Sequence, residues 1–287
     1  MSNKSGKKRK SDYLLMALII LLFLIGVGVM IYPDVASFSA SLSHAGLIEQ
    51  YEQEISELSN EVIEAEFNRA RKFNESLAGG AIEDPFILGS GFAIPDDYYE
   101  IFNTYHAMGV IQIPAINVKL PIFHGTTEDV LIRGVGHIPV TPFPVGQMGK
   151  HAVLTGHTGI PVSRLFTDLE LLEVGDLFFI TIMDQVMAYE IDQITVVLPD
   201  EVGDLRNVAN EDLVTLVTCT PYAINSHRLL VRGSRIPYEP ELLADIEVVI
   251  DSLNWRIWFV IVSVSLFIIS WFIFLIQSRR KRRKNRK

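Results

Sequence analysis

The chain has 287 residues, of which 49% are hydrophobic, and a formal net charge of −9 that is unevenly distributed. The first twelve residues carry a net charge of +4 and residues 277–287 carry +8, whereas residues 33–254 hold 33 acidic against 11 basic side chains. A middle region this acidic excludes nucleic-acid binding there, because such binding requires basic side chains opposite the phosphates.

Two long uncharged stretches, residues 14–32 and 257–276, lie at the ends of the acidic region. A helix of about 20 apolar residues spans the hydrocarbon core of a bilayer, so we expect transmembrane helices over residues 13–32 and 255–276. The first stretch has an alternative interpretation, a cleaved signal peptide with a small-residue site such as Ser37–Ala40. We favour a retained anchor, because the uncharged core is longer than that of a usual signal.

The basic tails, residues 1–12 and 277–287, predict the orientation of the chain in the membrane. Flanks rich in Lys and Arg stay in the cytoplasm, so both termini are expected to be cytoplasmic. The acidic region between the two spans is then extracellular, on the outer side of the cell membrane.

Residues 33–80 are expected to form a helical extension. Apolar side chains recur every three or four residues from Leu47 to Val62, and a stripe on a shifted face follows from Ala70 to Leu77. This pattern predicts one or two helices across Ser41–Leu77. We expect this arm to pack on the domain that follows; binding of a partner is the less favoured alternative.

Short strands separated by turn residues dominate residues 108–238, after a segment over residues 81–107 that begins as a surface loop. Only Ser163–Leu172 has a helical pattern there, and residues 239–254 form an amphipathic helix before the second span. Many short strands at this spacing predict a mostly β domain, a closed or nearly closed barrel of mixed topology. The predicted strands are Val110–Ile113, Val118–Phe123, His151–Thr155, Leu177–Met183, Met187–Val197, Leu213–Thr218 and Leu229–Arg232.

The chain has one cysteine, Cys219, directly after a predicted strand. A single cysteine forms no intrachain disulfide, so it is either a buried packing residue or a reactive thiol. If the strand Leu229–Arg232 pairs with the strand before Cys219, Arg228 lies close to the sulfur. A guanidinium there would stabilise an oxyanion or hold a substrate carbonyl. Spacing alone favours a surface charge for Arg228.

A cysteine nucleophile needs a group that carries a proton to the leaving amine, and histidine is the usual one. Of the seven histidines, His157 and His124 end predicted strands next to glycine, where a side chain can face a cleft. We favour His157 slightly over His124, and strand alternation places His227 on the face opposite Arg228. No cluster has zinc-ligand spacing and no phosphate loop or dinucleotide fingerprint occurs, so no cofactor or metal is expected.

Four segments in this order are similar to the motifs of a known family across roughly Met108 to Pro237. They are Ile111–Pro114, Leu120–Thr126, Leu154–His157, and Thr215–Cys219 with Arg228 nine residues later. The pattern resembles the sortases, the membrane-anchored cysteine transpeptidases of Gram-positive bacteria. This resemblance implies an eight-stranded sortase-type β-barrel. It also implies that Cys219 is the nucleophile, His157 the general acid/base and Arg228 the stabiliser of the oxyanion or substrate.

The flanking segments resemble class C, the pilin-polymerising sortases, which have a helical extension, a lid and a C-terminal span. Asp84, Pro85 and Phe86 are similar to the lid motif, so the resemblance implies that residues 81–107 are a lid and linker. The resemblance implies that Asp84 pairs with Arg228, and that Phe86 covers Cys219 and His157.

The same resemblance implies a reaction and its partners. The enzyme would cleave an LPXTG-like sorting signal through a thioacyl intermediate and join it to a lysine of another pilin. Its partners would be pilins or surface proteins that carry such signals. Two alternatives remain open: a sortase that attaches surface proteins to peptidoglycan, and a non-catalytic scaffold for surface assembly.

Overall fold

The computed structural model describes residues 4–77, 94–103, 107–160, 163–201, 205–241, 262–265 and 271. Its contacts divide the chain into two units, one of residues 1–35 with 248–287 and one of Ala36–Glu247. Helix α1 (Lys4–Ser56) continues through Pro33, where the sequence predicted the end of the anchor.

The described part of α1 from Leu18 onward is long and apolar enough to cross a membrane. This agrees with the predicted first span. The predicted amphipathic helix at 239–254 lies outside the described residues except for its first three. Of the predicted second span, only residues 262–265 and 271 are described, and all of them are helical.

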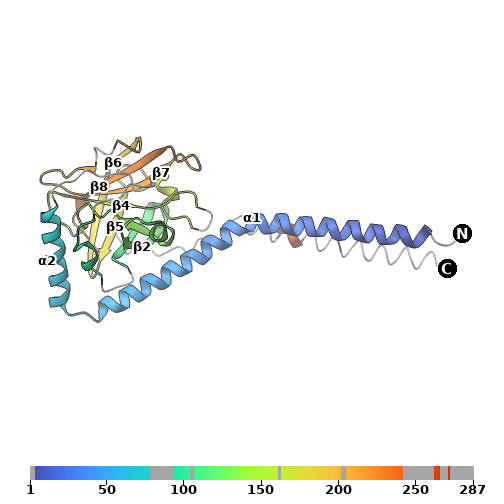
Figure 1. Ribbon diagram of the computed structural model, residues 1–287, viewed down its shortest axis with the longest axis horizontal. Helices are drawn as coiled ribbons and strands as arrows, with labels where there is room; N and C mark the ends of the chain where they lie inside the picture. The colour runs from blue at the N-terminus through green and yellow to red at the C-terminus, as the bar shows by residue number, and fades with distance from the viewer. Residues whose placement is uncertain are drawn as a thin grey trace. The chain divides into compact units, whose positions relative to one another are not determined.

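Eight strands form a closed barrel in the order β1-β2-β3-β4-β7-β8-β6-β5 (Figure 1). The pairs β2–β3 and β4–β7 are parallel and the other neighbours are antiparallel, so the predicted barrel of mixed topology is confirmed. The strands are β1 (Gly109–Ile113), β2 (Val118–His124), β3 (Val135–His137), β4 (Lys150–Thr155), β5 (Leu177–Ile182), β6 (Gln185–Val197), β7 (Asp212–Thr220) and β8 (His227–Ile236).

Besides α1, the helices are α2 (Asn60–Ser76), α3 (Glu128–Arg133) and the short 3-10 helices η1 (Tyr98–Glu100), η2 (Pro114–Ile116) and η3 (Thr167–Leu171). The helix predicted at Ser163–Leu172 is thus only the short η3. Both β3 and α3 escaped prediction, because Gly134 and Gly136 indicated a turn. Glycine is needed at 136, since a Cβ there would meet the backbone oxygen of Gly125 and lie 3.0 Å from the Leu131 side chain.

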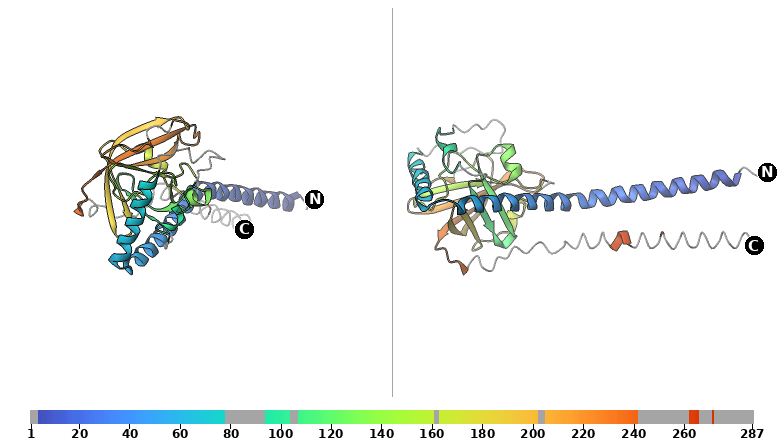
Figure 2. Two further views of the ribbon diagram at one scale, coloured as in Figure 1. Left: turned by 60° about the vertical axis from the view of Figure 1, so that its left-hand side comes forward. Right: turned by 90° about the horizontal axis from the view of Figure 1, so that it is seen from below.

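The helical arm, formed by the end of α1 and by α2, packs against the barrel, as predicted (Figure 1, Figure 2). Its side chains Ile55, Phe67 and Phe73 belong to the same buried apolar cluster as the barrel interior. Tyr51 adds two hydrogen bonds: its hydroxyl donates to the Met108 carbonyl at 3.1 Å and accepts from the Met183 N–H at 2.6 Å. Burial of this apolar surface fixes the arm on the domain.

A second, smaller apolar cluster lies on the opposite face of the β4–β7–β8 part of the sheet. Val153, Val217 and Leu230 belong to it, whereas their chain neighbours Leu154, Leu216 and Val231 belong to the main core. Because side chains alternate along a strand, the two clusters lie on the two faces of these strands.

Candidate active site

Cys219 and Arg228 lie directly opposite each other on the antiparallel strands β7 and β8. Opposed residues of such a pair point to the same face with Cβ atoms about 4.5–5.5 Å apart. Both residues are largely buried, with 9% of Cys219 and 6% of Arg228 exposed. Alternation places them on the face of the smaller apolar cluster, since Val217 and Leu230 are two residues away. The predicted closeness of Arg228 to the cysteine is confirmed.

The guanidinium of Arg228 is held by the turn that joins β7 to β8. Its Nη1 donates to the carbonyls of Asn225 at 3.1 Å and His227 at 2.9 Å. The turn is itself closed by the Asn225 N–H, which donates to the Pro221 carbonyl at 2.9 Å. A buried charge requires such partners, and here they also orient it at the end of β7.

The segment that carries His157 is bonded to the segment that carries Cys219. Gly156, just before the histidine, donates its N–H to the Val217 carbonyl at 3.1 Å, and its own carbonyl accepts from the Thr218 hydroxyl at 2.7 Å. These bonds continue the parallel pairing of β4 with β7 beyond Thr155. The residues that precede the cysteine and the histidine are therefore joined directly.

The loop after β4 is fastened to η3 on its other side. The Phe166 N–H donates to the His157 carbonyl at 3.1 Å, and the Gly159 N–H donates to the Thr167 hydroxyl at 3.0 Å. A Cβ on Gly156 would lie 2.9 Å from the Phe166 ring, so only glycine allows this close approach. The main chain around His157 is thus bonded on two sides.

The ring of His157 contacts a residue that sequence reasoning missed. Its Nε2 lies 3.2 Å from Oε2 of Glu128, the first residue of α3. A Thr followed by two acidic residues and an apolar pair, as in Thr127 to Leu131, is typical of a helix start and was the available signal.

The structure separates His124, the other histidine considered, from the cysteine. His124 ends β2, and strands β3 and β4 lie between β2 and β7 in the barrel. At about 4.8 Å per strand this is a separation of roughly 14 Å. The Nε2–H of His124 donates to the Ile101 carbonyl at 2.7 Å, and burial lowers the pKa of His124. The ring is therefore a structural group that lies apart from the cysteine.

A buried pair, Tyr98 and His137, fixes the segment before the barrel and also escaped prediction, because no periodicity marks it. The Tyr98 hydroxyl lies 3.0 Å from Nδ1 of His137 and accepts from the Gly125 N–H at 2.9 Å. The Nε2–H of His137 donates to the Pro142 carbonyl at 2.9 Å, and burial lowers the pKa of His137 to about 3. His227, as expected, is paired with Thr220, one position from the Cys219–Arg228 pair.

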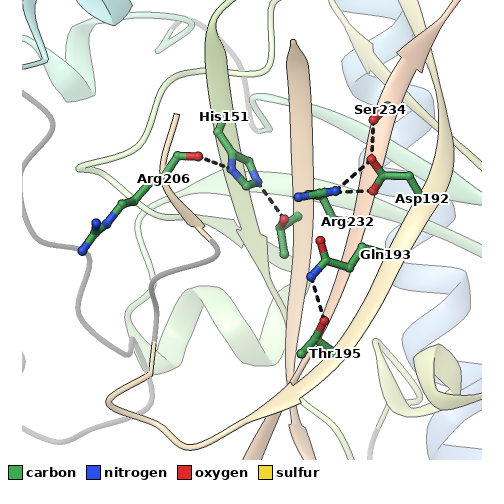
Figure 3. A network of polar contacts seen from close by, with 8 residues as sticks. His151, Asp192, Gln193, Thr195, Arg206, Arg232 and Ser234 are labelled. Carbon is green, nitrogen blue, oxygen red and sulfur yellow. Dashed lines mark hydrogen bonds and ion pairs between the residues drawn. The ribbon is translucent and has the colours of Figure 1, made fainter. Parts of the chain in front are cut away.

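A polar network lies farther along the face that carries Cys219 and Arg228, four residues away on both strands (Figure 3). Thr215 stands opposite Arg232, and its hydroxyl donates to Nε2 of His151 at 2.7 Å. The Nδ1–H of His151 donates to the Arg206 carbonyl at 2.9 Å, and Arg232 forms two hydrogen bonds with Asp192 at 2.9 and 3.1 Å. The network ties part of the β6–β7 connection to β4 and β7.

The predicted lid residues Asp84, Pro85 and Phe86 lie outside the described residues. Across the part of the chain that the structure describes, no three His, Cys, Asp or Glu side chains are grouped as metal ligands.

Residues 111–236 match the family model described as the sortase domain. Among curated proteins, sortase D of Bacillus subtilis strain 168 is 29% identical over 136 residues, which cover 46% of this chain and 66% of that protein. The match therefore spans just under two thirds of that relative.

Similarity to solved structures covers more of the chain. Sortase C of Streptococcus pneumoniae is 38% identical with a TM-score of 0.63, over 67% of this chain and 97% of that one. Sortase C1 of Streptococcus agalactiae is 41% identical with a TM-score of 0.64, over 69% of this chain and 98% of that one. The chain belongs to the sortase family, whose members are cysteine transpeptidases.

Proposed function

We propose that this chain is a membrane-anchored, class C cysteine transpeptidase in which Cys219 is the nucleophile, His157 the general acid/base and Arg228 the oxyanion stabiliser. The observation that carries the proposal is that the end of β7, the residues just after β4 and the start of β8 lie next to one another. The Thr218–Gly156 hydrogen bond links the cysteine and histidine segments, and the cross-strand register sets Arg228 opposite Cys219. A reactive thiol next to a cation at a strand end suits nucleophilic catalysis.

The first half of the proposed reaction forms a thioester. The thiolate of Cys219 attacks the carbonyl carbon of the Thr–Gly bond in an LPXTG-like signal, and the carbonyl oxygen takes up negative charge. Arg228 stabilises that charge. His157 gives its proton to the glycine nitrogen as the peptide bond breaks, which leaves the threonine carbonyl bonded to the sulfur.

The second half transfers the threonine to an amine. A lysine amine of another pilin subunit attacks the thioester carbon, His157 takes the proton that the amine loses, and the sulfur leaves as thiolate. The product is an isopeptide bond between threonine and lysine, and the enzyme returns to its starting state.

Pilins as substrates are supported by the structural neighbours. The S. pneumoniae sortase C structure was described for its bearing on pilin substrate specificity, and a similar sortase C of Group B Streptococcus is pilus-related. The matches to both extend beyond the barrel, since they cover 67% and 66% of the chain.

The membrane arrangement belongs to the same proposal. The apolar helix α1 supports an anchor near the N-terminus. The basic tails support a cytoplasmic location for both termini. The barrel at 108–238, which lies between the two predicted spans in the sequence, would then be extracellular. Asp84, Pro85 and Phe86 would form a lid over the site, as the resemblance to class C implies.

The test uses the full chain in lipid nanodiscs with a candidate pilin that carries an LPXTG-like signal. We expect covalent ladders whose linking peptide, identified by mass spectrometry, joins threonine to a lysine side chain. Cys219→Ala should form none. A product joined to a peptidoglycan cross-bridge amine would favour surface-protein anchoring, and ladders formed equally by Cys219→Ala would exclude the enzyme assignment.

A further inference from the structure

The imidazole of His157 has a carboxylate partner that the reaction above does not use. The 3.2 Å contact between His157 Nε2 and Glu128 Oε2 joins a ring whose side chain is 17% exposed to a carboxylate that is 72% exposed. Glu128 therefore lies at the outer rim of the site, on the side of the ring that faces α3.

The fold fixes the position of Glu128 independently of His157. Helix α3 connects the parallel strands β2 and β3 and begins after Thr127, whose carbonyl accepts the N–H groups of Val130 and Leu131, each at 3.0 Å. Leu131 is 2% exposed and packs over Gly136 of β3. Glu128 is thus presented from the first turn of a helix docked on the barrel.

The main-chain bonds around His157 leave the direction of its ring to be set by side-chain contacts. The bonds of Gly156 to β7 and of the His157 carbonyl to Phe166 locate the Cα atom. They do not determine rotation about the side-chain bonds. A carboxylate that accepts a hydrogen bond from Nε2–H fixes the orientation of the ring. The same bond fixes the tautomer, because it keeps the proton on Nε2.

We infer that Glu128 is a positioning residue for His157. Its carboxylate accepts the Nε2–H, so that Nδ1 is the nitrogen that exchanges a proton with the sulfur and the amine. The catalytic consequence rests on the proposed function, whereas the contact does not. Because the carboxylate is exposed and screened by water, its removal should lower kcat about three- to tenfold.

The first test is peptide cleavage by the full chain in nanodiscs, with quenched fluorescent Leu-Pro-Xaa-Thr-Gly peptides as probes. The variants are Glu128→Ala, which removes the acceptor of the Nε2–H, and Asp129→Ala, which removes the neighbouring carboxylate. For Glu128→Ala we expect a lower kcat and an unchanged KM for peptide. Asp129→Ala should match the wild type.

A wild-type kcat in Glu128→Ala would overturn the inference. So would a rise only in KM for the acceptor amine, because that result would make Glu128 an amine-binding residue. An unchanged melting temperature in both variants separates positioning from a structural role.

The second test needs no substrate. Since Cys219 is the one cysteine of the chain, iodoacetamide reports on that thiol alone. Glu128→Ala should slow alkylation about threefold, because an imidazole that is no longer held in direction pairs less well with the thiolate, with no change in Asp129→Ala. If the wild type cleaves no peptide, the proposed function fails, and alkylation still decides whether Glu128 acts on the Cys219–His157 pair. Equal alkylation in all three proteins would then refute it.

Discussion

Removal of the Asn74 side chain from α2 should loosen the helical arm by an amount that follows from its contacts. Asn74 is fully buried, and its amide faces the loop after β3. Its Nδ2 donates to the Phe143 carbonyl at 3.0 Å, and its Oδ1 accepts the Phe143 N–H at 2.7 Å. Asn74→Ala leaves the buried N–H of Phe143 without a partner, whereas the Phe143 carbonyl still accepts the N–H of Val145 at 2.9 Å.

Each buried polar group that loses its partner costs about 1–3 kcal/mol. One unpaired group predicts that Asn74→Ala lowers the free energy of unfolding by roughly 1–3 kcal/mol. Asn74→Asp keeps an acceptor for the Phe143 N–H but buries a carboxylate against the Phe143 carbonyl, so its cost should be no smaller. Asn68→Ala is the matched control, since Asn68 is exposed on the same helix and should change stability by less than about 0.5 kcal/mol.

Urea unfolding of the full chain in micelles, followed by the near-UV circular dichroism of tyrosine, measures these differences. Tryptophan fluorescence is unsuitable, because all three tryptophans, at positions 255, 258 and 271, lie in the predicted second span. If Asn74→Ala were no less stable than Asn68→Ala, the amide pair would contribute nothing, and the arm would be held by apolar contacts alone.

Further predictions concern catalysis, access and pH. Arg228→Lys keeps a positive charge but loses the planar guanidinium with its paired N–H donors, so kcat for peptide cleavage should fall roughly 10- to 100-fold. Iodoacetamide should still alkylate the thiol of this variant, and full activity would refute an oxyanion role. Asp84→Ala or Phe86→Ala should raise the rate of Cys219 labelling, and unchanged labelling would count against a closed lid. Acidification from pH 6.5 toward 3 should lower the free energy of unfolding, measured by urea titration. Burial lowers the pKa of His137 from 6.5 to about 3 in the folded protein. Between these pH values the unfolded chain binds the proton more tightly than the folded chain, so protons favour unfolding. Burial raises the pKa of Asp212 from 3.8 to about 6, which opposes that loss between these two values, so Asp212→Asn should lose stability more steeply on acidification.

The part of the fold that sequence predicts is the part with a local signal. Apolar residues of β7 and β8, separated by a segment rich in turn residues, predicted a hairpin. The eight residues between Cys219 and Arg228 suffice to set the two opposite each other. By contrast, β3 has only three residues with glycine at its centre and shows no alternation. Short elements of this kind are specified by what packs on them, here α3 and β2.

The residues of the candidate site were likewise predictable only where the local sequence carried a signal. Cys219 was marked by being the one thiol, whereas His157 and His124 had equivalent local settings and only the strand order of the barrel separates them. The contact of Glu128 with His157 joins residues 29 apart in the chain. No spacing rule connects them, because they meet only after β2, β3 and β4 have paired.

The hydrogen bonds of Gly156 to β7 have a consequence for how the proposed reaction would be controlled. The proposed nucleophile and the proposed acid/base group follow main-chain segments that are bonded to each other, so their backbones move together. A site of this kind is assembled during folding, and would not be switched by shifting one group away from the other. Control of the proposed reaction would then act through the surrounding loops, which admit the peptide.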